Sequence, residues 1–133
     1  MRLRYLPRLR PLALGAVLAV SLSGAALAAG ADDPMLKLAS QAGCLTCHHV
    51  EAGAQGPDGL APIGPAWREV AQKYRGSQAA VDQLTHTVMT GSNPYASHWK
   101  GKVSGLAMPP NEVAISEADA RRLVGWILTL SPP

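Results

Sequence analysis

Two long segments rich in glycine and proline divide this chain into short pieces. The first runs from Glu51 to Pro65 and the second from Ser92 to Ile115. Loops longer than about 12–15 residues are uncommon inside compact domains unless they are functional or disordered. The chain also contains no phenylalanine, and aromatic residues make up only 5% of it. We therefore predict that something other than side chains fills the centre of the fold, and a large apolar cofactor would do so.

The pieces between the two loops have the apolar spacing of amphipathic helices. A first helix is predicted to start at Asp33-Pro34, where an N-cap acid precedes a proline, and to end near Gly43. Two more are predicted from Pro65 to Gly76 and from about Gln78 to Thr90. A last one follows Ser116, which begins a segment resembling a capping box. No alternating strand pattern of useful length is present, so the predicted fold class is all-α, with about four short helices and two long loops.

The first 28 residues have the pattern of a secretory signal peptide. Met1 to Arg10 contains four arginines and no acid, and Leu12 to Leu22 is almost wholly apolar. Ala26-Leu27-Ala28 and Ala29-Gly30-Ala31 both match the A-x-A cleavage pattern. We predict cleavage between residues 28 and 31 and a single mature domain over residues 29–133. The alternative is an uncleaved membrane anchor, but glycine and serine interrupt the apolar run, and a spanning helix needs about 20 apolar residues.

Removal of the signal peptide changes the charge of the chain. The full sequence has 12 basic and 9 acidic residues, and the signal peptide carries four of the basic ones, so the mature chain is close to neutral, at −1. Nucleic acids and anionic membranes both select basic surfaces. We therefore expect no nucleic-acid partner and no stable membrane insertion of the mature chain.

The segment Cys44-Leu45-Thr46-Cys47-His48 is the attachment signature of c-type haem. Two thiols three residues apart on a helical turn can each add across one vinyl group of the haem. His48 then lies directly beneath the iron, where its imidazole can bind. The position of the motif just after a short helix, in a chain predicted to be exported, supports this interpretation.

Three other interpretations of the motif are possible. A thioredoxin-like redox pair needs a preceding strand and a βαβ context, which the pattern does not offer. A disulfide between Cys44 and Cys47 would close a tiny strained loop for little gain in stability. A zinc site would need both cysteines and two of four histidines, namely His48, His49, His86 and His98.

Met108 is the candidate for a sixth ligand to a haem iron. It lies in the second long loop and precedes Pro109 and Pro110, which fix the backbone beside it. Met35 and Met89 lie at helical spacing among apolar residues and are predicted to belong to the core. His49, His86 and His98 are predicted to face solvent; at most, His49 or His98 would serve as a misligand.

Taken together, these residues resemble class I cytochrome c, and most closely its short bacterial monohaem branch of secreted electron carriers. The resemblance covers nearly the whole mature chain in order. Its elements are the C-L-T-C-H motif, I-G-P-A-W at Ile63 to Trp67, Gly91-Ser92, Trp99, Met108-Pro109-Pro110 and the helix around Trp126.

The resemblance implies a class I cytochrome c fold around one haem c, attached through Cys44 and Cys47 and ligated by His48 and Met108. It also implies that the Pro65 carbonyl accepts a hydrogen bond from the His48 ring and that the Trp99 indole reaches a haem propionate. Segments 51–61 and 93–106 are longer than expected for the shortest members of the family.

Histidine and methionine together leave no iron position for dioxygen, peroxide or substrate. We therefore predict a monomeric, soluble periplasmic one-electron carrier that is not an enzyme and docks briefly with periplasmic redox proteins. The near-neutral mature charge favours apolar contact around the haem edge over a basic docking ring. One alternative is the haem c subunit of a periplasmic oxidoreductase complex, with the two longer segments as interface. Another is a haem enzyme, such as a peroxidase, with Met108 detached.

Overall fold

The computed structural model describes residues 33–133. The predicted signal peptide and its cleavage sites lie outside the described residues. Within residues 33–133 the regular structure consists of helices, with no β-strand. The four α-helices are α1 (Pro34–Gln41), α2 (Trp67–Lys73), α3 (Ala80–Thr90) and α4 (Glu117–Thr129), and three 3₁₀ turns occupy Cys44–Thr46, Pro57–Gly59 and Pro94–Ala96. The all-α prediction is confirmed.

Side-chain caps start the first and last helices where the sequence predicts. The Asp33 carboxylate accepts a hydrogen bond from the Met35 amide at 2.7 Å. The Ser116 hydroxyl accepts one from the Asp119 amide at 3.1 Å, and it donates one to the Asp119 carboxylate at 2.9 Å. Each cap satisfies an amide that has no partner within the helix. The capping residues therefore fix where α1 and α4 begin.

Helices α2 and α3 each begin two residues later than the apolar pattern predicts. Pro65 is excluded from α2 because Ala66 is extended (φ −63°, ψ 141°), and the Glu69 carboxylate accepts the Ala66 amide at 3.3 Å. Before α3, the Ala80 amide bonds to the Ser77 carbonyl at 3.3 Å, which closes a turn after Gly76. Apolar spacing cannot locate these boundaries because local hydrogen bonds decide them.

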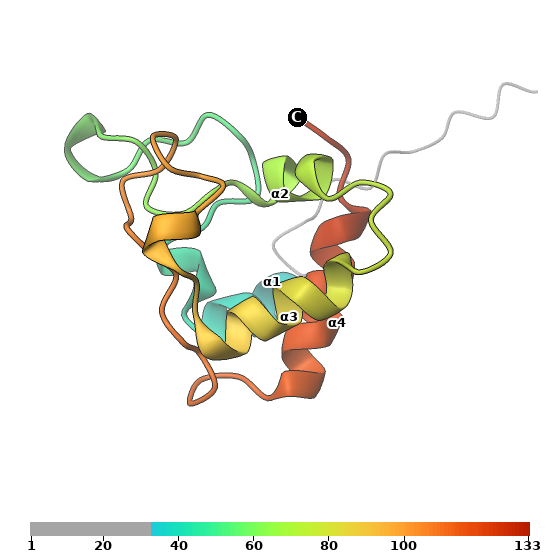
Figure 1. The fold of residues 1–133 in the computed structure, drawn as a ribbon. Coiled ribbons are helices and arrows are strands. Elements are labelled where there is room, and N and C mark those ends of the chain that lie inside the picture. The colour runs from blue at the N-terminus through green and yellow to red at the C-terminus, as the bar shows by residue number, and fades with distance from the viewer. Residues whose placement is uncertain (1–32) are drawn as a thin grey trace, which may run out of the picture.

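Helix α4 is the central packing element, and it contacts α1, α2 and α3. Figure 1 shows the first long loop and the first part of the second long loop on one side of this helical frame, while the end of the second loop leads into the start of α4. Backbone hydrogen bonds join the loops there: the Ser104 amide bonds to the Pro62 carbonyl at 2.9 Å, and the Gly105 amide to the Ile63 carbonyl at 3.0 Å. The loops are thus attached to each other as well as to the helices.

The buried core is small and rich in alanine. Trp67 is its largest member, and Trp126 meets it edge-on with ring centroids 5.8 Å apart. Met35 and Met89 pack against this core, as the sequence predicts. Small side chains let the helices approach closely but fill little volume. The fully buried members are Ala39, Ala42, Trp67, Ile115, Ala120, Leu123 and Ile127.

No helix within residues 33–133 has the length and apolar character that a membrane span requires.

Thr85 generates a stability prediction because its hydroxyl is buried and has no hydrogen-bond partner among the described residues. Burying a hydroxyl without a partner costs about 1–3 kcal/mol. Thr85→Val keeps the shape of the side chain and removes the hydroxyl, so it should raise the free energy of unfolding of the holoprotein by about that amount. Denaturant titration measures the change.

Thr87→Val is the matched control on the same helix. The Thr87 hydroxyl donates to the Gln83 carbonyl at 3.0 Å, so its loss should leave stability unchanged or slightly lower. Equal effects of the two substitutions would contradict the prediction for Thr85.

Candidate functional site

The Cys44–His48 motif lies on a single tight turn. Gly43 has a left-handed backbone (φ +74°) that ends α1 and starts the 3₁₀ turn Cys44–Thr46. The amides of Cys47 and His48 both bond to the Cys44 carbonyl, at 3.3 and 3.1 Å. Both cysteines are free thiols and half-buried, and burial raises the pKa of the Cys44 thiol. The turn therefore presents two thiols and an imidazole from five consecutive residues.

Two of the alternative interpretations of the motif disagree with this geometry. Helix α1, not a strand, precedes the motif, so the βαβ context of a thioredoxin-like pair is missing. Across residues 33–133, no three His, Cys, Asp or Glu side chains form a group suited to a metal ion, so the zinc interpretation fails as well. The other histidines, His49, His86 and His98, are exposed, as the sequence predicts.

The His48 ring is held in one orientation by the Pro65 carbonyl. His48 Nδ1 lies 2.8 Å from that oxygen, which can only accept, so Nδ1 carries the proton and Nε2 is left with its lone pair. The hydrogen bond that the resemblance implies is therefore present. Trp67 stacks on the ring at a centroid distance of 6.1 Å. Burial lowers the pKa of His48, which the Pro65 bond partly offsets, and this favours the neutral ring that a metal needs.

Gly64 makes room for this ring. A Cβ atom at position 64 would lie 2.7 Å from His48 Cε1 and 2.9 Å from Nδ1, which is closer than van der Waals contact allows. The Gly64 amide also bonds to the Cys47 carbonyl at 2.7 Å. The glycine before Pro65 is thus required by the close approach of the imidazole.

Ser92 holds the backbone of Met108 at both of its polar groups. The Met108 amide donates to the Ser92 hydroxyl at 2.8 Å, and the Met108 carbonyl accepts from the Ser92 amide at 2.9 Å. Gly91 lies beside them with φ +84°, and a Cβ atom there would be 2.9 Å from the Met108 carbonyl oxygen. Met108 is therefore fixed against the end of α3.

Asn111 secures the loop on the other side of the two prolines. Its side-chain amide donates to the Pro109 carbonyl at 2.7 Å, and its backbone amide donates to the Val88 carbonyl of α3 at 3.0 Å. The Met108-Pro109-Pro110 turn is thus tied to α3 from both ends. The roles of Ser92 and Asn111 were not predicted from the sequence. An asparagine two residues after Pro109 is a signal for a local side-chain bond of this kind.

One cavity of about 340 Å³ gathers all six predicted site residues: Cys44, Cys47, His48, Pro65, Trp99 and Met108. The two long loops and the helices α2, α3 and α4 supply the other walls. The helices contribute apolar side chains, with Val70, Leu84, Val88, Leu123, Val124 and Ile127 among them. The cavity therefore offers space for the large apolar cofactor that the small core suggests, and each of the six predicted site residues borders this cavity.

Comparison with known proteins agrees with this arrangement. The family described as cytochrome c matches residues 36–131. The chain belongs to the cytochrome c family. Its fold is that of class I, and covalent haem c is the cofactor of the family. Electron transfer is the activity of this family.

Small bacterial cytochromes are among the relatives of the chain. Cytochrome c-551 of Allochromatium vinosum is 44% identical over 95 residues, which cover 71% of this chain and 84% of the relative. Cytochrome c-551 of Pseudomonas aeruginosa is 32% identical over 123 residues, which cover 91% of this chain and 98% of the relative. The crystal structure of Nitrosomonas europaea cytochrome c552 is similar with a TM-score of 0.55 and 34% identity, covering 71% of this chain and 96% of that one.

The residues of the cavity fit haem c. Cys44 and Cys47 have the spacing for two thioether bonds, and both thiols border the cavity. His48 offers an Nε2 lone pair because Nδ1 is used by Pro65. Met108 offers a soft sulfur on a backbone that cannot move far. The apolar walls suit a large apolar ring.

The close approach of Gly64 to His48 generates a second prediction. Gly64→Ala would force a methyl group against the imidazole, so it should strain the Pro65 bond and destabilise the holoprotein by about 1–3 kcal/mol. Guanidinium unfolding followed by visible absorbance measures the effect and reports any change at the haem.

Gly125→Ala in α4 is the matched control, because a Cβ atom there meets nothing within 4 Å. Helix propensity alone should then raise stability by up to about 1 kcal/mol. If Gly64→Ala is as harmless as Gly125→Ala, the tight contact with His48 does not constrain the site.

Proposed function

We propose that the mature chain is a soluble periplasmic one-electron carrier in which His48 and Met108 ligate a haem c attached through Cys44 and Cys47. The observation that carries this proposal is the shared cavity, where an oriented imidazole and a methionine with an anchored backbone border the same apolar space as the two thiols. When bound, haem c supplies a one-electron couple of iron. The family to which the chain belongs supports the transfer of electrons as its activity.

Residues around the cavity hold the ring of His48 and the backbone of Met108, which would be the two ligands of a bound haem. Pro65 fixes the tautomer and tilt of His48, and such outer partners strengthen a histidine ligand. Ser92 and the two prolines that follow Met108 restrict the backbone of Met108. A thioether is a soft donor that favours reduced iron and raises the reduction potential. With His48 and Met108 as its ligands, a bound haem would exchange electrons and would leave no iron position for a substrate.

The apolar walls contribute to the same function. Val70, Leu84 and Val88 line one part of the cavity, and Leu123, Val124 and Ile127 line another. A low-polarity surrounding disfavours the additional positive charge of oxidised iron, which again raises the potential.

Met108→Ala tests the proposal directly. Loss of the soft donor should lower the reduction potential and open a position that binds carbon monoxide or cyanide readily. Met108→His should lower the potential too, because nitrogen is a harder donor, but should keep that position closed. Redox titration and ligand-binding spectra measure both effects.

Met89→Ala serves as the control. Met89 packs against the core, so its truncation should cost stability, at most about 2–5 kcal/mol, with little change in potential. If Met108→Ala leaves potential and ligand access as they are, Met108 only fills space and the proposed ligation is wrong.

A separate experiment tests whether the chain acts as a lone carrier or as a subunit of a stable complex. Size exclusion of native periplasmic extract should show the haem-containing chain as one small species, since the proposal is a mobile carrier. Elution in a stable larger complex would instead favour the oxidoreductase subunit. Mass spectrometry of the same fraction should show a chain that begins between residues 29 and 32.

A further inference from the structure

The side chain of Arg68 joins three segments that lie far apart in the sequence. Its Nε donates to the Glu51 carboxylate at 2.8 Å, and its Nη1 donates to the Ser131 carbonyl at 2.9 Å. Glu51 begins the first long loop, and Ser131 belongs to the end of the chain, which Figure 1 shows beside α2. One guanidinium therefore fastens the start of the loop and the end of the chain to the first turn of α2.

Arg68 differs in two ways from Arg121 and Arg122, the other arginines that form ion pairs among residues 33–133. Each of these two meets one carboxylate, and their side chains are 47% and 64% exposed, whereas that of Arg68 is 18% exposed. The planar fork of an arginine can hold two partners at once. The helix dipole disfavours a cation in the first turn of a helix, so α2 itself gains nothing from Arg68. Its partners outside the helix account for its place.

The backbone of Arg68 takes part in the pairing of residues 47–50 with residues 64–68. The Arg68 amide donates to the Val50 carbonyl at 3.2 Å, which is the last hydrogen bond of this pairing. Near its other end the His48 ring forms the 2.8 Å bond that fixes its tautomer. The contacts of the Arg68 side chain thus hold the outer end of the pairing that orients the imidazole.

The first long loop provides few other anchors for this pairing. Between residues 52 and 61, the backbone hydrogen bonds found in the described part of the chain are local. They join the Gly56 amide to the Leu60 carbonyl and the Leu60 amide to the Pro57 carbonyl. Closing a loop costs conformational entropy, which contacts at the two ends of the loop must offset. The bond from Arg68 to Glu51 lies at one of these ends, where opening of the pairing would start.

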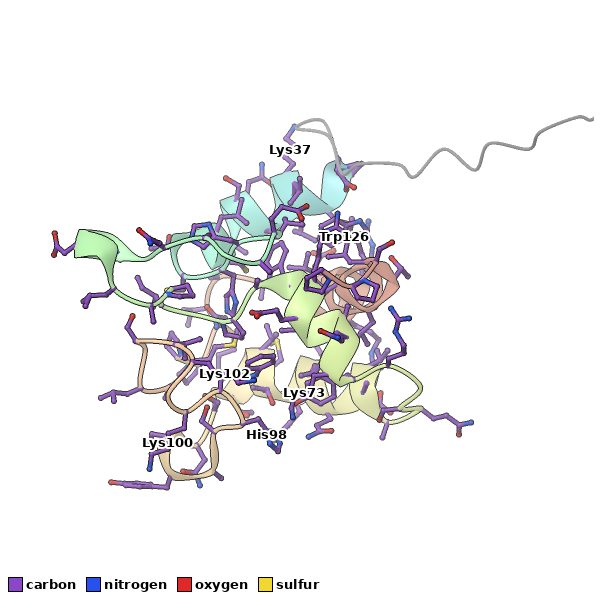
Figure 2. The ribbon with its side chains drawn as sticks, turned by 90° about the horizontal axis from the view of Figure 1, so that it is seen from above. Lys37, Lys73, His98, Lys100, Lys102 and Trp126 are labelled. Carbon is purple, nitrogen blue, oxygen red and sulfur yellow. The ribbon has the colours of Figure 1, made fainter. Side chains whose placement is uncertain are left out.

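Trp67 connects the position of Arg68 with the imidazole. It directly precedes Arg68 in α2, stacks on the His48 ring and meets Trp126 of α4 edge-on. Figure 2 shows Trp126 beside α4, away from Lys100 of the second long loop. Arg68 therefore acts from the side where α2 and α4 meet, and not through the second loop.

We propose that Arg68 is a positioning residue for His48. By holding Glu51 and Ser131 against the first turn of α2, it keeps the pairing closed and the imidazole against the Pro65 carbonyl. The inference rests on the proposed function, because it concerns His48 as a haem ligand. Arg68 is not among the residues that line the cavity, so its effect passes through its neighbours. Glu51 and Ser131 are exposed, so loss of the guanidinium leaves neither of them buried without a partner.

Arg68→Leu tests the proposal, with Arg122→Leu as the matched control. Each substitution removes one positive charge and one ion pair, but only Arg68 contacts the pairing. The reduced ¹⁵N-labelled holoprotein is transferred to D₂O, and NMR follows exchange of the His48 Nδ1 proton and the Trp67 amide. In Arg68→Leu both protons should exchange about tenfold faster relative to amides in the middle of α4, because only the local pairing opens more often. Arg122→Leu should leave this ratio unchanged.

Three results would overturn the proposal. Equal acceleration of the His48 proton and the α4 amides would mean that Arg68 contributes to global stability alone. Unchanged exchange of the His48 proton in Arg68→Leu would mean that Arg68 does not hold the pairing. An equal effect of Arg122→Leu would mean that the loss of charge, and not of the contacts, matters.

Two further variants refine the test. Arg68→Lys keeps the charge but not the planar fork, so it should restore part of the protection of the His48 proton. If Arg68→Leu yields no holoprotein, Glu51→Gln removes one of the two partners, and the same exchange ratio then decides. Because exchange needs no electron transfer, failure of the inference is distinguishable from failure of the carrier function, which Met108→Ala tests.

Discussion

The hydrogen bond between the His48 ring and the Pro65 carbonyl lies in the middle of a short ladder of long-range contacts. On one side of it the Gly64 amide bonds to the Cys47 carbonyl at 2.7 Å. On the other side the Trp67 amide bonds to the His49 carbonyl at 2.8 Å. The 2.8 Å bond of His48 thus belongs to a continuous pairing of the haem motif with the start of α2. The first long loop joins these two paired segments, so the pairing brings the two ends of the loop together.

The same ladder links the site to the core. Trp67 stacks on His48 and meets Trp126 of α4 edge-on, so one side chain contacts both the imidazole and the central helix. Helix α4 also packs on α1 and α3, so contacts through Trp67 and α4 connect the His48 ring with the rest of the helical frame. Trp67 therefore joins the imidazole of the candidate site directly to the small, alanine-rich core.

The sequence predicts those parts of the fold and site that have local signals. Asp33 and Ser116 predict helix starts because each cap bonds to an amide within three residues. The Cys44–His48 motif predicts haem attachment because the reacting thiols and the imidazole lie within five consecutive residues. The clamp of Ser92 on Met108 joins residues 16 positions apart, and no periodicity reports it. The two long loops are paired through Pro62 and Ser104, which lie 42 positions apart, and no sequence pattern predicts this pairing either. Such contacts depend on how the helices bring distant segments together.

The net charge of the chain does not show where its charged residues lie. Without the predicted signal peptide the chain is close to neutral, and this net charge led to the expectation of an apolar docking face. Three arginines form ion pairs with acidic residues. Lys100 and Lys102, which follow Trp99 in the chain, take part in no ion pair among residues 33–133. Within one loop, half-buried Trp99 borders the cavity while the next residue, Lys100, lies exposed at the surface. Consecutive residues therefore connect the wall of the cavity with the outer surface of the molecule.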